Sequence, residues 1–265
     1  MTAHACSPDA DPRPGVVGFP FLSLRCEGEV SRKLVILGTS SNAYDILDLV
    51  DAINQSGAVW EIAGFLDDAR ARGSRCEDYE VIGGVRDAAR LSGVEFMNSI
   101  GGDRTFRKRA ELVAMTGVPP ERFATLVHPA ALVSRRARLG AGTCVNGFVR
   151  VASGVSIGNH VWLGTGCTVE FGCGVDDYAV IGPRALIGGG ARIESSALVG
   201  AGAALRPRVI VGKKSQIGLG AVVIGDVAAG STVVGNPART LVRTPHNGPK
   251  AGRGATDTPP PREGI

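Results

Sequence analysis

An aliphatic residue recurs at every sixth position from Val133 to Val223, sixteen times without a gap. A small or β-branched residue stands two positions before each of them, as Ala131, Thr143 and Cys167 do. Neither the 3.6-residue period of a helix nor the two-residue alternation of a strand produces this spacing. The pattern indicates a hexapeptide repeat, which is the sequence signature of a parallel β-helix.

The repeat predicts a triangular prism over residues 129–242, in which each hexapeptide supplies one short strand and one corner. Three hexapeptides make a coil of 18 residues, so about five coils are expected to stack at a spacing of ~4.8 Å. The aliphatic residue points into the prism, and Leu163, Ile181 and Val199 are expected to form one interior column. Glycine follows the aliphatic residue in eight of the sixteen repeats, where we expect it to take the tight corner.

A different pattern over residues 31–128 predicts a small α/β domain with a parallel, Rossmann-like sheet. Short apolar runs alternate there with segments in which apolar residues follow helical spacing. The predicted elements are, in order, a strand at 33–37, a helix at 44–53, a strand at 59–65, a strand, a short helix and an apolar run within 81–100, and a helix at 103–116.

The composition suits a fold of small side chains, because 38 of the 265 residues are glycine and 5% are aromatic. Apolar runs stay shorter than the ~18 residues of a membrane span, and the first residues lack the pattern of a signal peptide. The six cysteines have no CxxC spacing, so we expect a reducing cytoplasm rather than a disulfide framework or a zinc site. Both ends, 1–30 and 243–265, are predicted to be disordered. The net charge of +4 lies mostly after Asn236 and gives little support to a nucleic-acid partner.

Four further motifs accompany the repeat. They are Lys33–Gly38 followed by Thr39–Asn42, then Gly64–Asp68 (GFLDD), Thr125–Pro129 (TLVHP) and Val233–Ala238 (VVGNPA). With these motifs in this order, residues 33–242 resemble the left-handed β-helix acyltransferases, in the branch of the bacillosamine-type nucleotide-sugar N-acetyltransferases and the sialic acid O-acetyltransferase-like proteins. The resemblance implies a left-handed prism, a homotrimer, and an acyl-CoA bound in the groove between neighbouring prisms.

The resemblance also implies acyl transfer from a thioester to an amine or a hydroxyl, with a histidine base in the pattern Asn-(six residues)-His-(Glu/Asp). That register falls here on Gly164, Phe171 and Gly172, so all three polar groups are absent. A general base contributes a rate factor of ~10²–10⁴. Phe171 therefore marks a non-standard active site.

Three other side chains are candidates for a replacement base. His160 is either a displaced base or a solvent-exposed corner residue. Asp176 should stack on Glu194, 18 residues later, and two adjacent carboxylates raise the pKa of one of them. Glu170 stands next to Phe171.

The ligand-binding residues follow from the resemblance as well. For the acyl-CoA, small residues would let the pantetheine arm approach the backbone and basic residues would neutralise the phosphates; the expected residues are Gly202, Ala203, Lys213, Gly220, Asn236, Pro237 and Arg239. The acceptor is expected at the turn after the first strand and at the end of the second, on Gly38, Thr39, Ser40, Asn42, Asp67 and Asp68. Backbone amides at the start of the intervening helix suit an anion such as a nucleotide phosphate.

Three functions remain open from the sequence. The first is an acyl-CoA-dependent acyltransferase acting on an amine or hydroxyl of a small molecule, such as a nucleotide sugar. The second is a trimeric binding or scaffold protein that has lost the transfer step. The third is a transferase whose acyl group is larger or is carried by an acyl carrier protein, with Phe171 making the pocket more apolar. We expect no metal, no nucleic-acid partner and no membrane contact.

Overall fold

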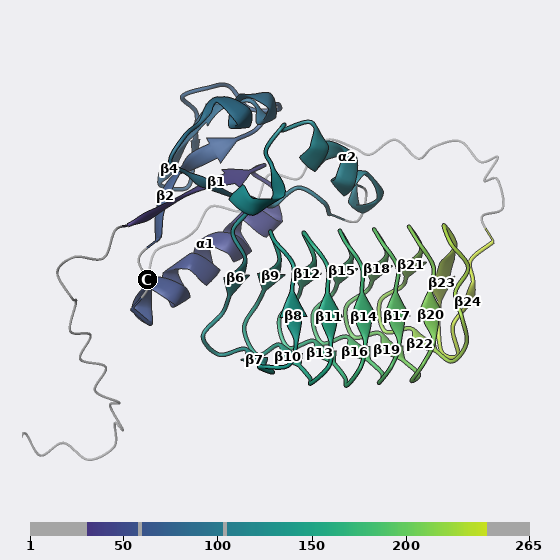
Figure 1. Ribbon diagram of the computed structural model, residues 1–265. Helices are drawn as coiled ribbons and strands as arrows, with labels where there is room; N and C mark the ends of the chain where they lie inside the picture. The colour runs from purple at the N-terminus through teal and green to yellow at the C-terminus, as the bar shows by residue number, and fades with distance from the viewer. Residues whose placement is uncertain (1–30, 58–59, 103–104, 243–265) are drawn as a thin grey trace, which may run out of the picture.

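The computed structural model describes residues 31–57, 60–102 and 105–242, so both ends that the sequence predicts to be disordered lie outside the described residues. A small α/β part is followed by a long stack of coils (Figure 1). Among the described residues, no helix has the length and apolar character needed to cross a membrane.

The α/β part is built on one five-stranded sheet with the order β3-β4-β2-β1-β5. Its strands are β1 (Arg32–Leu37), β2 (Trp60–Leu66), β3 (Arg75–Cys76), β4 (Tyr79–Gly83) and β5 (Glu95–Asn98). β1 runs parallel to β2 and β5, and β2 runs parallel to β4. The parallel sheet is therefore confirmed, with an antiparallel hairpin of β3 and β4 at its edge that the sequence analysis missed.

The helices of this part are short except for the first. They are α1 (Ser41–Gln55), η1 (Val85–Arg90), η2 (Phe106–Lys108), α2 (Arg109–Ala114) and η3 (Pro120–Arg122). The single helix expected at 103–116 is in fact a 3-10 turn, η2, followed by the six residues of α2. Ser40 precedes α1, but its hydroxyl donates to the Ser99 carbonyl instead of capping the helix.

The coils form a prism with three faces, each a stack of short parallel strands. Face 1 contains β6 (Leu126–Val127), β9 (Cys144–Val145), β12 (Trp162–Leu163), β15 (Val180–Ile181), β18 (Leu198–Val199), β21 (Gln216–Ile217), β23 (Thr232–Val234) and the antiparallel β24 (Arg239–Thr240). Face 2 contains β7 (Leu132–Val133), β10 (Arg150–Val151), β13 (Thr168–Val169), β16 (Leu186–Ile187), β19 (Ala204–Leu205) and β22 (Val222–Val223). Face 3 contains β8 (Arg138–Leu139), β11 (Ser156–Ile157), β14 (Gly174–Val175), β17 (Arg192–Ile193) and β20 (Ile210–Val211).

Three edges join these faces, and each edge is a column of corners. Edge 1–2 carries Thr165, Pro183, Ala201 and Leu219 at the middle of successive corners, and the backbone of each coil bonds to the next. Edge 2–3 carries Ser153, Phe171, Gly189 and Pro207 in the same way. Edge 3–1 carries Asn159, Asp177, Ser195 and Lys213.

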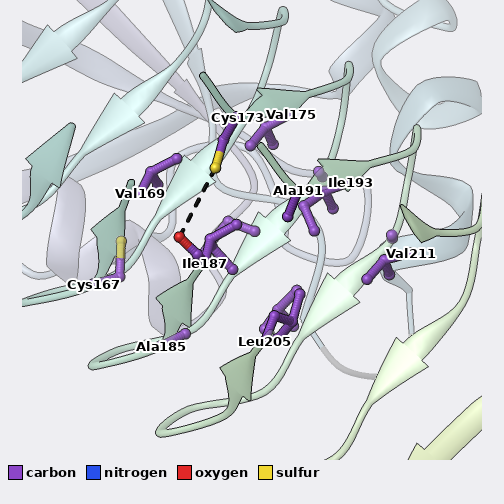
Figure 2. Packing of buried hydrophobic residues seen from close by; sticks show 14 of the residues in the cluster. Cys167, Val169, Cys173, Val175, Ala185, Ile187, Ala191, Ile193, Leu205 and Val211 are labelled. Atoms are coloured by element: carbon purple, nitrogen blue, oxygen red, sulfur yellow. Dashed lines mark hydrogen bonds between the residues drawn. The ribbon is translucent and has the colours of Figure 1, made fainter. Parts of the chain in front are cut away.

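The aliphatic residues of the six-residue register point into the prism. Leu163 pairs with Ile181 and Ile181 with Val199, which confirms the expected interior column. The small residues fill the space between these columns, and Figure 2 shows Cys167, Cys173, Ala185 and Ala191 among the larger aliphatic side chains. The thiol of Cys173 donates a hydrogen bond to the Gly188 carbonyl at 3.2 Å. Small and branched side chains together therefore fill a core that has almost no aromatic residue.

Glycine serves two separate purposes at the corners, whereas the sequence analysis assigned it one. The third residue of a corner takes the left-handed conformation, as in Gly166 (φ 68°) and Gly202 (φ 67°). The glycine that directly follows the aliphatic residue does not. It is needed because a Cβ on Gly182 would lie 2.6 Å from the Ala201 nitrogen of the next coil. The glycines that directly follow the aliphatic residues are thus required by close stacking, whereas those at the third corner position suit the turn.

One of the buried clusters joins the α/β part to the prism. A single cluster of buried side chains includes Leu34 of β1, Ile46 of α1, and Leu126, Cys144 and Trp162 of face 1. Since β6 already pairs with β9, the prism begins at Leu126, slightly before the expected boundary at residue 129. Helix α1 therefore lies between the sheet and the first coils (Figure 1).

Replacing Ile187 with alanine is expected to destabilise the protein by about 2–5 kcal/mol, because this fully buried side chain leaves a cavity that the stacked coils cannot close. Leu186 is the matched control, since it belongs to the same strand and is 43% exposed. Equilibrium unfolding in urea at one protein concentration should give Leu186→Ala a much smaller effect. Equal losses for the two variants would contradict the assignment of the inner and outer positions.

Candidate active site

The turn between β1 and α1 is held by Asp67 at the end of β2. One carboxylate oxygen of Asp67 accepts hydrogen bonds from the Thr39 amide at 2.8 Å and from the Thr39 hydroxyl at 2.6 Å. The other oxygen accepts from the Ala69 amide at 2.8 Å. Burial alone would raise the pKa of Asp67, but these hydrogen bonds, Thr39 foremost, and the Arg70 charge outweigh it and lower the pKa. Asp67 is thus an ionised brace for the turn.

Other residues expected to bind the acceptor are also engaged in the turn. The Asp68 carboxylate accepts from the Val85 amide at 2.8 Å. Ser40 and Asn42 both donate to the Ser99 carbonyl, at 2.9 and 3.2 Å. Gly38 has a φ of 86°, and a Cβ there would lie 2.6 Å from Ile100. The structure brings Asp67 against the β1–α1 turn, whereas Asp68 bonds to the start of η1, and most polar groups of the predicted set already bond to the protein itself.

A pocket of about 270 Å³ opens between this turn and the prism. Asn42 and Asp45 of α1 form one wall, and Gly101 and Gly102 form another. The floor is face 1 together with edge 1–2, and its residues are Trp162, Val180, Gly182, Pro183, Leu198, Val199, Gly200, Ala201, Gln216, Ile217, Gly218 and Leu219. Of the predicted acceptor residues, Asn42 alone lines this pocket.

His160 lies inside the contact between the two parts of the chain and is 3% exposed. Its ring stacks on Tyr178 at a centroid distance of 4.9 Å and meets the edge of Phe123 at 4.5 Å. Burial, and to a lesser extent the charge of Arg109, lower the pKa of His160 to about 4. The expectation of a solvent-exposed corner histidine is therefore wrong. A ring enclosed in this way does not suit a displaced base either.

Arg109 of α2 holds the same contact together. Its side chain is 1% exposed and donates to the backbone carbonyl of His160 at 2.8 Å. The Nε and Nη1 atoms of this guanidinium are buried and have no hydrogen-bond partner among the residues that the structure describes. Nearby, Arg107 donates to the Lys214 carbonyl at 2.9 Å. The segment of η2 and α2 thus lies along edge 3–1, above the prism in Figure 1.

The acidic candidates for a base lie on two different edges. Asp176 is on edge 3–1, where burial first, then Asp177 and Glu194, raise its pKa as the stacking of carboxylates predicts. Glu170 is on edge 2–3 and pairs with Arg150 at 2.9 Å. Phe171, beside Glu170, points outward and is 68% exposed. The structure does not bring Asp176 and Phe171 together within one chain.

After Phe171, the next two corners of edge 2–3 consist first of glycines and then of arginines around a proline. The next corner is Gly188–Gly189–Gly190, and the one after it is Arg206–Pro207–Arg208. The arginine corner lines a concave site of about 440 Å³ together with Val209, Gly225 and Asp226. Along the prism axis, Phe171 is thus followed by a corner without side chains and then by a concave site with two arginines. The hydrophobic period did not reveal this alignment, although counting corners at intervals of 18 residues would have done so.

The residues expected to bind acyl-CoA are divided among edges. Gly202 and Gly220 lie on edge 1–2, where a Cβ would meet nothing within 4 Å, and Asn236 and Pro237 follow β23 beneath them. Lys213 lies on edge 3–1, and Arg239 is exposed in β24. Ala203 is fully buried inside the prism, so its expected contact with a cofactor is wrong.

The buried thiols of Cys144 and Cys167 are poor nucleophiles in this environment. Burial raises the pKa of Cys167 to about 12 and raises the pKa of Cys144 further. The described residues include no cluster of three His, Cys, Asp or Glu side chains able to hold a metal ion. Asp45, Trp162 and the Gly101–Gly102 wall are the pocket residues that sequence reasoning missed, because each looks like an ordinary part of its helix, strand or loop.

Comparison with solved structures identifies the relatives of this arrangement. The acetyltransferase domain of PglB from Neisseria gonorrhoeae FA1090 is 32% identical, with a TM-score of 0.69 and a match covering 80% of this chain and 100% of that domain. That domain also has a structure in complex with acetyl coenzyme A. PerB from Caulobacter crescentus, in complex with CoA and GDP-perosamine, is 25% identical, with a TM-score of 0.68 and coverage of 79% of this chain and 97% of PerB. WeeI from Acinetobacter baumannii AYE is also 25% identical, with a TM-score of 0.68 over 80% of this chain and all of WeeI. No protein-family model and no curated protein matches.

The stacked prism with an α/β part ahead of it is thus the fold of an acyltransferase of the hexapeptide-repeat type. This chain belongs to the family of left-handed β-helix sugar acetyltransferases. The resemblance inferred from the sequence motifs is confirmed.

The buried His160 makes stability depend on pH in a defined window. The unfolded chain takes up a proton near the ordinary pKa of ~6.5, whereas the folded chain does so near 4. Stability is therefore complete above pH ~6.5 and falls by about 1.4 kcal/mol per pH unit as the pH drops toward 4. Asparagine also tolerates the left-handed backbone of residue 160 (φ 55°). Urea unfolding at pH 7 and pH 5 should show His160→Asn losing roughly 2 kcal/mol less than the wild type. A variant with the same pH dependence as the wild type would refute the assignment.

Proposed function

We propose that this protein transfers the acetyl group of acetyl-CoA to the amine of a small sugar, carried as a nucleotide sugar. The observation that supports this most is the 32% identity to the PglB acetyltransferase domain over the whole of that domain. PerB adds support, since it is a relative that has been seen with CoA and an amino-sugar nucleotide together.

We place the acceptor in the pocket between α1 and face 1. It is formed by the two parts that this family combines, and it contains apolar walls with a few polar groups, as small-molecule sites do. The β1–α1 turn beside it, braced by Asp67, leaves the start of α1 directed toward the same region. A nucleotide phosphate at these helix amides remains a prediction.

We place the acyl-CoA along the prism edges, between two copies of the chain. Phe171 and the arginine corner belong to edge 2–3, while the acceptor pocket adjoins edge 1–2 with Gly202 and Gly220. These edges of one chain face apart, so a homotrimer would complete each site by setting edge 2–3 of one copy beside edge 1–2 of the next. Arg206 and Arg208 would then meet the CoA phosphates.

If the acceptor is an amine, the transfer depends little on a general base at position 171. The amine nitrogen attacks the thioester carbonyl, the new C–N bond forms, the C–S bond breaks, and CoA leaves as a thiol after taking up the proton released by the nitrogen. A neutral amine is a better nucleophile than a hydroxyl and depends less on a general base. Loss of the histidine therefore favours N-acetylation over O-acetylation.

The donor site predicts that acetyl-CoA raises the thermal unfolding midpoint of the protein. At 100 times its Kd, the ligand should add roughly 2.7 kcal/mol to stability. The double variant Arg206→Glu/Arg208→Glu should bind acetyl-CoA at least tenfold more weakly, because it reverses the charge of the hollow on edge 2–3. Arg138→Glu on face 3 is the control for a general change of charge. Equal weakening by both changes would count against this site.

The altered active site predicts a gain of function. Phe171→His should raise the rate of acetyl transfer to an amino sugar by at least tenfold, because it supplies an imidazole base at the position that the family resemblance implies. Phe148→His is the matched control, since Phe148 is another corner phenylalanine, 74% exposed, but on edge 1–2. CoA release can be followed with a thiol reagent. An unchanged rate in Phe171→His would argue against a site at this corner.

Two alternatives are decided by these measurements. Transfer that occurs only in Phe171→His would identify the wild type as a binding or scaffold protein that has lost the chemical step. If longer acyl-CoAs raise the unfolding midpoint of the wild type more than acetyl-CoA does, the exposed, apolar Phe171 favours a larger or carrier-bound acyl group.

A further inference from the structure

Among the described residues that line the pocket between α1 and face 1, Asp45 is the one with a charged side chain. The other walls of the pocket are the apolar surfaces of Trp162, Val180 and Leu198 and the backbone of the glycine-rich corners. None of the described residues that line it is a lysine, an arginine or a histidine. A carboxylate in such a pocket attracts a positively charged group.

Asp45 is free to receive such a group. Within the described part of the chain, its carboxylate makes no hydrogen bond or ion pair, in contrast to Asp67 and Asp68 nearby. Asn42 stands three residues earlier, on the same side of α1, and also lines the pocket. The amide nitrogen of Asn42 donates to the Ser99 carbonyl at 3.2 Å, which leaves its carbonyl oxygen as a second acceptor.

The surroundings of Asp45 make a cationic partner favourable. Burial first, and then the charge of Asp48, raise the pKa of this carboxyl. Both effects destabilise the ionised carboxylate, so a nearby positive charge would stabilise it. An ammonium group bound beside Asp45, which is exposed at the pocket, would supply that charge.

We propose that this pocket binds the acceptor through its protonated amino group, which gives its proton to solvent before the neutral amine attacks, and that Asp45, helped by the Asn42 carbonyl, is the residue that receives it. The inference rests on the proposed function, because it names the chemical group of the acceptor that the pocket selects. Asp45 is then a specificity-determining residue. It favours an amine over a hydroxyl, and it releases the product because an acetylated nitrogen carries no charge.

The test compares binding of an amine with binding of its acetylated form. The probes are GDP-perosamine, the amino-sugar nucleotide seen with PerB, and its N-acetylated product. The wild type should bind the amine more tightly than the product, and Asp45→Asn should lose roughly 10- to 100-fold of that preference, as expected for a hydrogen bond to a charged group. Asp45→Glu keeps the carboxylate and should retain part of it.

Asp51→Asn is the matched control, since Asp51 is an exposed aspartate on the same helix but outside the pocket. Unfolding in urea shows whether each variant is folded. If the wild type prefers the amine and Asp45→Asn keeps that preference, the role of Asp45 is overturned while the proposed function stands. If the wild type neither binds GDP-perosamine nor releases CoA from acetyl-CoA in its presence, the proposed function fails and this inference fails with it.

Discussion

The structure depends on the parallel stacking of one coil on the next. Each strand of the prism has two or three residues, so it has almost no stability alone and exists because its backbone bonds to the coils before and after it. This constraint fixes which residues point inward, as Ile181 and Val199 do, and which stand at corners. It also fixes the three edges as straight columns, and these columns are where chemistry can be displayed.

The α/β part packs on face 1 of the prism, so part of its apolar surface is buried by the prism and not by its own elements. Helix α1 buries Ile46 and Leu49 in a cluster that continues into Trp162 of face 1. A pocket forms where this joint leaves a gap, bounded by the turn that Asp67 holds. The site thus combines two kinds of rigidity, a hydrogen-bonded turn on one wall and stacked backbone on the other. Such a pocket needs little reorganisation to bind a ligand.

Much of the prism could be predicted from the sequence because its period is strict and one residue type, an aliphatic at each sixth position, decides the inside. The α/β strands were found for a similar reason, since Lys33–Leu37 is a short apolar run between turn residues. The two-residue strand β3 carries no such signal. The pocket could not be predicted, because Asp45 and Trp162 meet only through the packing of α1 on face 1, and nothing local to either residue records that packing. His160 was misjudged for the same reason, since α2 covers its corner.

The contact between Arg109 and residue 160 has a consequence for how this family varies. The guanidinium reaches a main-chain carbonyl, so the histidine side chain is not what it binds. Any residue that accepts the left-handed backbone at position 160 could offer the same oxygen. In an alignment, Arg109 could therefore stay constant while position 160 drifts, and no pair of correlated substitutions would reveal that the two are joined. This link between α2 and edge 3–1 is therefore made through the backbone of position 160.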